Sequence, residues 1–378
     1  MTRSIDRIHL PACSPGTTRT VTVHRYGDAG ARPKAYLQSG LHADEIPGML
    51  ALSHLVSALD EAADQGRILG EVIVIPTVNP IGIGQRMNGS LLGRYEMGGD
   101  GNFNRNWPRL TDAVEARVSD RIGPEEAANA LLIREALRAA VAALPADTEL
   151  RALRRAVMSE SIDADIVLDV HCDNDALTHI YCGPALWPDA ADLSAEVGSR
   201  ATMLATDSGG DPFDEVHSLV WHELSERLSS VGPIPQACLS ATVELRGQAD
   251  VWPEMAAADA AALLRFLQRR GVVAGDPGPL PTPQCDATEL NATEVLKTPV
   301  PGVASYVKRL GDQVREGEVV AQVVDPSADD PLGTAVDVKA GTDGLVFTTR
   351  RDKMVRQGQT IAKIVGTKPV REGRLLDD

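Results

Sequence analysis

The chain has 378 residues, of which 43% are hydrophobic and 24% charged, and its formal net charge is −16. These proportions are typical of soluble globular proteins, and two domains are expected because single hydrophobic cores stop growing at about 250–300 residues. The negative charge argues against nucleic acid or an anionic membrane as a partner, since both would be repelled.

The cysteines and the N-terminus bear on the cellular compartment. The cysteines are odd in number and form no CxxC pair, which favours a reducing environment over a disulfide framework; they are Cys13, Cys172, Cys182, Cys238 and Cys285. The first residues, MTRSIDRIHLPACSPG, lack the apolar run of a signal peptide, and no stretch of about 18 apolar residues occurs. We therefore expect a soluble, cytoplasmic protein.

The first part of the chain alternates between strand and helix patterns. Residues 19–26 alternate in polarity as a strand does, and residues 34–40 have the pattern of a more buried strand. Residues 46–63 have helical apolar spacing, with Pro47 tolerated in the first turn, and residues 71–80 return to an apolar, β-branched strand. This succession predicts a parallel α/β sheet.

The alternation continues after a long loop. The loop, residues 81–108, is rich in glycine and asparagine and too long for an ordinary connector, so we expect it to be functional. An amphipathic helix is predicted at 124–145, a buried strand at 163–171 and a helix at 253–270. The predicted fold class is α/β, with a mixed, largely parallel sheet flanked by helices.

The last hundred residues have a different pattern. Residues 275–284 are rich in proline and glycine and mark a boundary. Beyond them, short strands are separated by glycine turns, which predicts a small all-β barrel, and residues 314–324 echo residues 355–365 as an internal duplication would. The predicted domains are a catalytic domain at 1–274, a linker at 275–290 and the barrel at 291–378.

The segment GLHADEIPG at 40–48 carries the strongest local signal. His42 and Glu45 stand three apart in a tight loop between a buried strand and a helix start, where open α/β sheets form their active sites. A metal site is one interpretation. The alternative makes Glu45 an acid favoured by the helix dipole and His42 a surface loop residue.

A second polar group follows the predicted strand at 163–171. In IVLDVHCDND, His171 and three aspartates come at the end of an apolar run. A lone histidine there is often structural or solvated, but two histidines and one carboxylate at strand ends are the ligands of a catalytic zinc site that leaves its fourth position to water. The pattern favours one Zn²⁺ per chain at His42, Glu45 and His171, although another divalent ion is compatible with the same ligands.

Hydrolysis at such a site also needs a base. Zinc lowers the pKa of its water toward ~7 and polarises the carbonyl, and a base must take the second proton and pass it to the leaving amine. Glu244, at the end of a third predicted strand, is the candidate because a carboxylate between Val243 and Leu245 is otherwise an odd residue to bury. The alternative is an edge-strand glutamate that points to solvent.

The long loop supplies cations. Its segment GRYEMGGDGNFNRNWPR contains Arg94, Arg105 and Arg109 among glycines and asparagines. Arginine side chains bind carboxylates in two-point geometry and stabilise developing oxyanions. The loop is therefore a candidate for substrate binding, with a solvated basic loop as the alternative.

Taken in order, these motifs resemble one enzyme family. The chain contains H-x-x-E, an arginine, an N-R pair followed by an aromatic residue and proline, D-x-H after a strand, and T-x-E. The set resembles the zinc carboxypeptidase superfamily, most closely its succinylglutamate desuccinylase/aspartoacylase branch, over about residues 34–250. The resemblance implies a zinc carboxypeptidase-like fold for this part, and the barrel looks like the family's appended β domain.

The resemblance implies roles for the residues of the predicted metal site. His42, Glu45 and His171 look like the metal ligands. Glu244 looks like the general base that activates water. Asn102 stands where many members have an aspartate that orients the first histidine, and its amide oxygen can accept the same N–H bond.

The resemblance also implies how the substrate is bound. Asn104 and Arg105 are similar to the pair that binds the substrate's free carboxylate. Arg94 looks like the arginine that polarises the scissile carbonyl, and Arg86 is the competing candidate for that role.

The implied activity is removal of an acyl group from a small N-acylated amino acid or related carboxylate. A metallocarboxypeptidase that acts on peptide C-termini is the alternative with the same chemistry. A non-catalytic metabolite-binding module is the alternative from a different class.

The barrel, about residues 291–366, is similar to biotinyl and lipoyl domains. Those carriers present a lysine flanked by methionine or alanine at a hairpin tip, whereas Lys353 and Met354 stand here in DKMV, outside that context. We therefore expect a covering or oligomerisation element, and relatives with such a barrel suggest a homo-oligomer.

Overall fold

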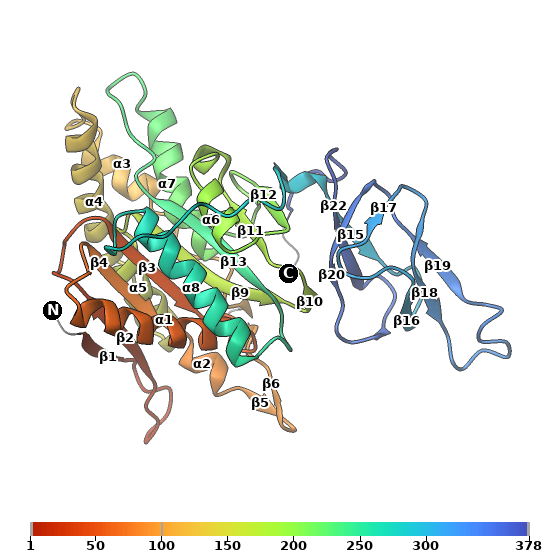
Figure 1. Ribbon diagram of the computed structural model, residues 1–378. Coiled ribbons are helices and arrows are strands. Elements are labelled where there is room, and N and C mark those ends of the chain that lie inside the picture. The colour runs from red at the N-terminus through yellow and green to blue at the C-terminus, as the bar shows by residue number, and fades with distance from the viewer. Residues whose placement is uncertain (1–2, 100, 376–378) are drawn as a thin grey trace.

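A mixed nine-stranded sheet forms the centre of the computed structural model, which describes residues 3–99 and 101–375 (Figure 1). Its strand order is β1-β2-β4-β3-β9-β13-β11-β12-β14. The strands are β1 Ser4–His9, β2 Thr20–Tyr26, β3 Lys34–Ser39, β4 Glu71–Ile75, β9 Ile166–Asp173, β11 His179–Cys182, β12 Ala201–Leu204, β13 Leu239–Gly247 and β14 Ala287–Glu289. The central strands β4, β3, β9 and β13 are parallel to their neighbours in this group, which confirms the predicted fold class.

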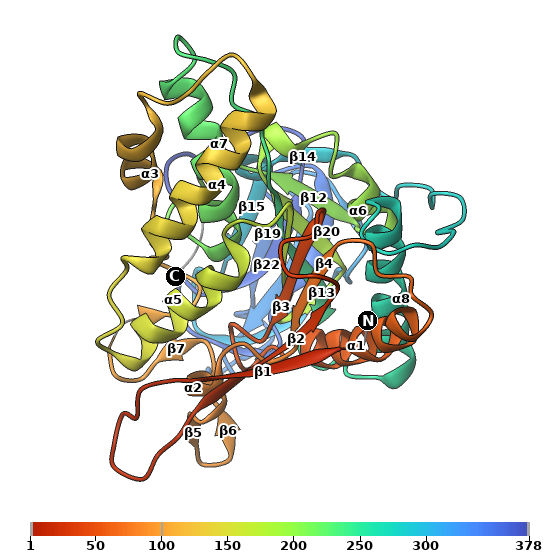
Figure 2. The same ribbon diagram turned by 90° about the vertical axis from the view of Figure 1, so that its left-hand side faces the viewer.

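Helices cover both faces of this sheet, because its central strands are apolar on both sides. Helices α1, α6 and α8 pack on one face, and α3, α4, α5 and α7 pack on the other (Figure 2). Their bounds are α1 Pro47–Asp64, α2 Pro80–Ile83, α3 Thr111–Val118, α4 Glu126–Ala142, α5 Glu149–Ser161, α6 Ala191–Glu196, α7 Phe213–Arg227 and α8 Pro253–Arg269. The predicted helices correspond to α1, α4 and α8, whereas α5 and α7 had not been predicted.

The long loop at 81–108 has internal structure. It contains two small antiparallel pairs, β5 Arg86–Met87 with β6 Ser90–Leu91 and β7 Tyr95–Glu96 with β8 Gly101–Asn102. The backbone of Gly93 lies so close to the loop after β3 that a Cβ there would be 2.3 Å from the Asp44 amide nitrogen. Gly93 also accepts a hydrogen bond from Ala43 at 2.9 Å. A residue without a side chain is therefore required for the long loop to reach the segment that carries His42.

The C-terminal strands form two antiparallel sheets that share one hydrophobic core. One sheet has the order β10-β20-β22-β15, with β17 also paired to β20, and the other has the order β19-β18-β16-β21. The strands are β10 Asp175–Ala176, β15 Thr293–Lys297, β16 Gly302–Tyr306, β17 Gln313–Val314, β18 Val319–Val324, β19 Val336–Lys339, β20 Gly344–Thr349, β21 Met354–Val355 and β22 Thr360–Val365, and single 3₁₀ turns lie at Pro184–Leu186 and Leu290–Ala292. We call strands β15–β22 the C-terminal β region.

The two similar segments, residues 314–324 and 355–365, have the same local structure. Each contains a two-residue strand, a turn with a left-handed glycine and a six-residue strand, with Gly317 in the first segment and Gly358 in the second. The domain boundaries stay a prediction, and β14, within the proposed linker, joins the edge of the main sheet. All five cysteines are free thiols. Among the described residues, no helix has the length and apolarity needed to cross a membrane.

A cluster of ion pairs around Asp163 connects the starts of β3 and β9. Lys34 Nζ lies 2.6 Å from Asp163 Oδ1, and Arg138 Nη1 lies 2.9 Å from Asp163 Oδ2. Burial by itself would raise the pKa of Asp163, but Lys34 and then Arg138 and Arg32 lower it below its usual value. These pairs stabilise the register of β3 against β9, and the opposite ends of both strands carry the site described below.

Asp163→Asn is expected to lower the free energy of unfolding by about 3 kcal/mol at pH 6–7, because it leaves Lys34 buried without a counter-charge. A carboxyl whose pKa is lowered in the folded state stabilises the protein above its unfolded pKa, about 3.9, and stops doing so as the pH falls through the folded value. The difference between variant and wild type should therefore shrink below about pH 4. Urea unfolding across this pH range measures it, and the exposed pair of Asp147 with Arg151 provides Asp147→Asn as a control with little effect.

Candidate active site

The predicted site residues converge where parallel strands end. His42 follows β3, His171 lies near the end of β9, and Glu244 lies near the end of β13. Because β3, β9 and β13 are parallel neighbours, their carboxyl ends meet at one edge of the sheet, where open α/β folds bind ligands.

Two imidazoles and one carboxylate form the centre of this site. His42, Glu45 and His171 are each 3% exposed, and one ligand atom from each lies within 4.8 Å of the others. His42 Nδ1 is 2.9 Å from Glu45 Oε1, and His171 Nδ1 is 2.7 Å from Glu45 Oε2. Both histidines thus direct the same ring nitrogen toward the same carboxylate.

The opposite ring nitrogens are held by other acceptors. His42 Nε2 lies 2.7 Å from Asn102 Oδ1, and His171 Nε2 lies 2.8 Å from Asp169 Oδ2. If His42 Nε2 carries its proton, as Asn102 Oδ1 favours, the His42 Nδ1 lone pair faces the Glu45 carboxylate with no proton between them. A cation between the three groups resolves that conflict, and second-layer acceptors of this kind are usual for metal-bound histidines. The residues therefore fit a divalent metal.

The ionisable groups in this cluster shift one another's pKa values. Burial would raise the pKa of Glu45, but His42 and His171 hold it well below its usual value. Burial and then Arg94 lower the pKa of His42. The carboxylate and the His42 imidazole are therefore favoured in the forms that can bind a metal. Burial would lower the pKa of His171, but Asp169 and Glu45 raise it well above its usual value, so a metal bound there would displace a proton.

Glu244 stands next to His171 across the sheet. The two residues are register partners on β13 and β9, and Glu244 pairs with His179 of β11 on its other side. The edge-strand alternative is wrong, because β13 lies inside the sheet. Glu244 Oε2 is buried without a hydrogen-bond partner among the described residues. Burial and then the charge of Glu45 raise the pKa of Glu244 to about 8.

The structure separates the two competing arginines. Arg94 donates to Glu45 Oε1 at 2.9 Å and lines the cavity, whereas Arg86 is exposed on β5 and does not line it. Arg94 is thus the better placed of the two to reach a substrate carbonyl. Arg109 lies away from the cavity in an exposed ion-pair cluster with Asp207 and Asp211.

Asn104 and Arg105 are both buried at the cavity wall. Asn104 Nδ2 lies 3.4 Å from His171 Nε2, and Asn104 Oδ1 accepts the backbone N–H of Phe213 at 2.8 Å. The N-R pair is therefore held between the metal-site strand and the start of α7.

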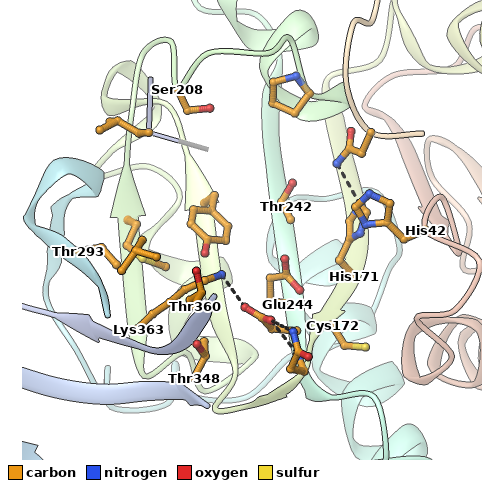
Figure 3. Close-up of a pocket in the computed structure, with 18 of the residues that line it drawn as sticks. His42, His171, Cys172, Ser208, Thr242, Glu244, Thr293, Thr348, Thr360 and Lys363 are labelled. Atoms are coloured by element: carbon orange, nitrogen blue, oxygen red, sulfur yellow. Dashed lines mark hydrogen bonds and ion pairs between the residues drawn. The ribbon is translucent and has the colours of Figure 1, made fainter. Parts of the chain in front are cut away.

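A cavity of about 720 Å³ lies over these residues (Figure 3). The sheet provides one wall with His42, His171 and Glu244, and the C-terminal β region provides the facing wall, to which Thr293, Thr348, Thr360 and Lys363 belong. The sequence analysis expected this region to be a covering or oligomerisation element, but no motif indicated which of its residues would line the cavity. The cavity therefore depends on both parts of the chain.

Two ion pairs join the C-terminal β region to the end of β9 and to β10, which follows it. Lys363 Nζ lies 2.7 Å from Asp173 Oδ2, and these side chains are only 25% and 14% exposed. Lys353 Nζ lies 3.0 Å from Asp175 Oδ2, with exposures of 41% and 35%. Only the first pair lines the cavity.

Lys363→Met is expected to lower the free energy of unfolding by about 2–3 kcal/mol, because Asp173 keeps its charge in a buried position without its partner. Lys353→Met is the matched control and should cost less than about 1 kcal/mol, since that pair is solvated. Urea unfolding of both variants measures the difference. Equal losses would show that Lys363–Asp173 behaves as a surface pair.

Comparisons with known proteins agree with this arrangement. A family model described as the succinylglutamate desuccinylase/aspartoacylase catalytic domain matches residues 31–270, more than half of the chain. N-alpha-acetyl-L-2,4-diaminobutyric acid deacetylase of Halomonas elongata is 28% identical over 348 residues, which are 91% of this chain and 84% of that protein.

Solved structures share the fold over nearly the whole chain. A succinylglutamate desuccinylase/aspartoacylase family protein of Shewanella amazonensis has a TM-score of 0.85 at 22% identity, covering 96% of this chain and 98% of that one. The product-bound ectoine utilization protein EutE (DoeB) of Ruegeria pomeroyi has a TM-score of 0.67 at 16% identity, covering 96% and 95%. Both alignments extend well beyond the residues that the family model matches.

Proposed function

Because this chain belongs to the succinylglutamate desuccinylase/aspartoacylase family, we propose that it hydrolyses the amide bond of a small N-acylated amino acid with Zn²⁺ held by His42, Glu45 and His171. The observation that carries the proposal is the convergence of two Nδ1 atoms on one carboxylate beside Glu244, whose Oε2 has no hydrogen-bond partner in the part of the chain that the structure describes. One zinc ion per chain would polarise the scissile carbonyl and acidify a water molecule there.

The residues of the chain supply the remaining chemistry. Glu244 accepts a proton from the attacking water as its oxygen adds to the carbonyl carbon. The C–N bond then breaks, and Glu244 passes the proton to the leaving nitrogen, which gives a carboxylic acid and an amine. Arg94 donates hydrogen bonds to the carbonyl oxygen as negative charge develops on it.

Asn104 and Arg105 are proposed to bind the free carboxylate of the substrate. Arg105 is buried at the cavity wall, where a two-point contact to a carboxylate is strongest. This contact fixes one end of the substrate while the scissile carbonyl lies between Arg94 and the two histidines. Binding of a short substrate is favoured over binding of a polypeptide, because the C-terminal β region forms the wall of the cavity that faces the sheet.

A substrate panel tests this function against the carboxypeptidase alternative. The zinc-loaded protein is expected to release acid from N-acetyl or N-succinyl amino acids with a higher kcat/KM than it shows for peptides. Nα-acetyl-2,4-diaminobutyrate belongs in the panel, because the Halomonas elongata relative is named for that substrate. Preferential cleavage of peptides would overturn the choice. Whether the chain forms a homo-oligomer is a separate prediction, which sedimentation velocity checks.

A further inference from the structure

Two buried polar residues of β3, Tyr36 and Gln38, lie on the face of the sheet that carries His171. Gln38 is the register partner of Asp169 on β9, and His171 follows two residues further along that strand. Because side chains alternate between the two faces of a strand, all four side chains project from the same face. Neither Tyr36 nor Gln38 lines the cavity, so neither can contact a substrate there.

These side chains form one continuous chain of hydrogen bonds. The hydroxyl of Tyr36 donates to Gln38 Oε1 at 2.7 Å, and Gln38 Nε2 donates to Asp169 Oδ1 at 3.0 Å. The other carboxylate oxygen, Asp169 Oδ2, lies 2.8 Å from His171 Nε2. Tyr36, Gln38 and Asp169 are 0% exposed. The chain of bonds therefore runs from the core of the protein to a proposed metal ligand.

The chemistry of the groups fixes the direction of each bond. A carboxylate only accepts hydrogen bonds, so the Gln38 amide must turn its Nε2 toward Asp169 and its oxygen toward Tyr36. The Tyr36 hydroxyl must then be the donor. Burial, and after it the charges of Glu160 and Asp169, hold the pKa of Tyr36 well above its usual value, so the hydroxyl keeps the proton that it donates. With Oδ1 held by Gln38, Asp169 has Oδ2 left to accept the Nε2 proton of His171.

Packing alone does not explain why Tyr36 and Gln38 are polar. Apolar side chains of the same shape would fill these two positions about as well as a hydrogen-bonded polar pair. The buried hydroxyl of Tyr26 on β2 joins its strand to α1, because it donates to the Val56 carbonyl. The hydroxyl of Tyr36 instead bonds within its own strand, so it connects no two elements. What the Tyr36–Gln38 pair does contact is the carboxylate that holds His171.

We propose that Gln38 and Tyr36 are positioning residues for the metal site. Through Asp169 they fix the ring of His171, so that its Nδ1 is directed at the ion. The inference rests on the proposed function in one respect, since it takes His171 as a metal ligand. Groups that orient a metal ligand typically contribute about 10- to 100-fold to metal affinity. Gln38 acts one bond further out and Tyr36 two, so their contributions should decrease in that order.

The zinc affinity of two variants tests the proposal. Gln38→Met keeps the length of the side chain and removes the donor, and Tyr36→Phe keeps the ring and removes the hydroxyl. Competition with a chromophoric chelator measures the dissociation constant of Zn²⁺ on the folded protein. It is expected to rise by about tenfold in Gln38→Met and about threefold in Tyr36→Phe. The visible spectrum of the cobalt-loaded protein should change in the same order, because it depends on the geometry of the ligands.

A double variant separates positioning from a purely structural role. Gln38→Met by itself leaves the Tyr36 hydroxyl buried without an acceptor, which is costly, and adding Tyr36→Phe removes that hydroxyl. The metal-free double variant should therefore unfold at a higher urea concentration than Gln38→Met. Its dissociation constant for Zn²⁺ should nevertheless stay raised at least as much. If stability and zinc affinity recover together in the double variant, the role of the pair is structural and the proposal is overturned.

Tyr26→Phe is the matched control. It also removes a fully buried hydroxyl from the main sheet, one that donates to Val56 O and to Asp60 Oδ1 at 3.0 Å each. This variant should lose stability but keep the wild-type dissociation constant for Zn²⁺ and the wild-type cobalt spectrum. The proposal fails if Gln38→Met binds zinc as tightly as the wild type, or if Tyr26→Phe weakens zinc binding as much as Tyr36→Phe does.

Hydrolysis of N-acetyl amino acids by the wild type distinguishes failure of the positioning role from failure of the proposed function. If none of these compounds is hydrolysed but zinc affinity falls in the expected order, the proposed function fails and the positioning role stands. If the wild type hydrolyses them and all variants bind zinc equally, the positioning role fails and the proposed function stands. A wild type that binds no zinc would overturn both.

Discussion

A Glu244→Gln variant is expected to retain its metal and to lose kcat by about 10²- to 10⁴-fold, because an amide cannot take the proton from water. The substitution keeps the size of the side chain, and Glu244 is not among the three proposed ligands. Glutamine also removes an acid that is costly to bury, so stability should not fall. Steady-state kinetics on an N-acetyl amino acid and metal analysis of the purified variant measure the two properties.

The outcome of that experiment also separates an enzyme from a binding module. Glu254→Gln, an exposed glutamate in the first turn of α8, is the control and should behave as wild type. Full activity in Glu244→Gln would show that another group is the base. Absence of turnover in both the wild type and the variant, with metal bound, would instead favour the non-catalytic alternative.

His171→Ala is expected to abolish stoichiometric metal binding, and activity with it. The imidazole is one of only two in the proposed ligand set, and its loss leaves Glu45 and Asp169 without their partner. A metal that binds only the folded state stabilises it by about 4 kcal/mol at a thousandfold excess over Kd, so zinc should raise the Tm of metal-free wild type but not of the variant. Differential scanning fluorimetry with and without Zn²⁺ measures this.

A histidine outside the cavity provides the control for that experiment. His222 lies on α7 with a side chain that is 31% exposed, and it does not line the cavity. His222→Ala should keep one metal per chain and the wild-type rise in Tm. Chelation should inactivate the wild type, and added zinc should restore it. Stoichiometric metal in His171→Ala would contradict the ligand assignment.

The candidate metal site could be predicted because its signals are local. His42 and Glu45 follow a buried strand directly, and His171 and Glu244 each end an apolar run. Polar residues at the carboxyl ends of buried parallel strands meet at one sheet edge regardless of the details of packing. Apolar periodicity likewise predicted the central strands and the longest helices. A strand or helix that packs in the core must carry apolar residues at the spacing that places them on its buried face.

Local patterns could not decide between alternatives within one segment. Arg94 and Arg86 belong to the same polar loop, and only the contact of Arg94 with Glu45 and its place in the cavity lining show which one reaches the site. The position of β13 inside the sheet likewise depends on pairing with β9 and β11, which no apolar run specifies. The edge and interior interpretations of Glu244 were therefore equivalent until the strand order was known.

Short motifs and burial periodicity were enough to predict the fold class, the family resemblance and the candidate metal, base and carboxylate-binding residues. Which residues line the cavity opposite those motifs depends instead on how distant parts of the chain pack against one another. Lys363 and Asp173 are 190 residues apart, and Phe213 of α7 lies 109 residues beyond Asn104, to which its backbone N–H donates. Contacts between residues so far apart produce no periodic pattern in the sequence, because each partner needs only to be a polar residue at its own position.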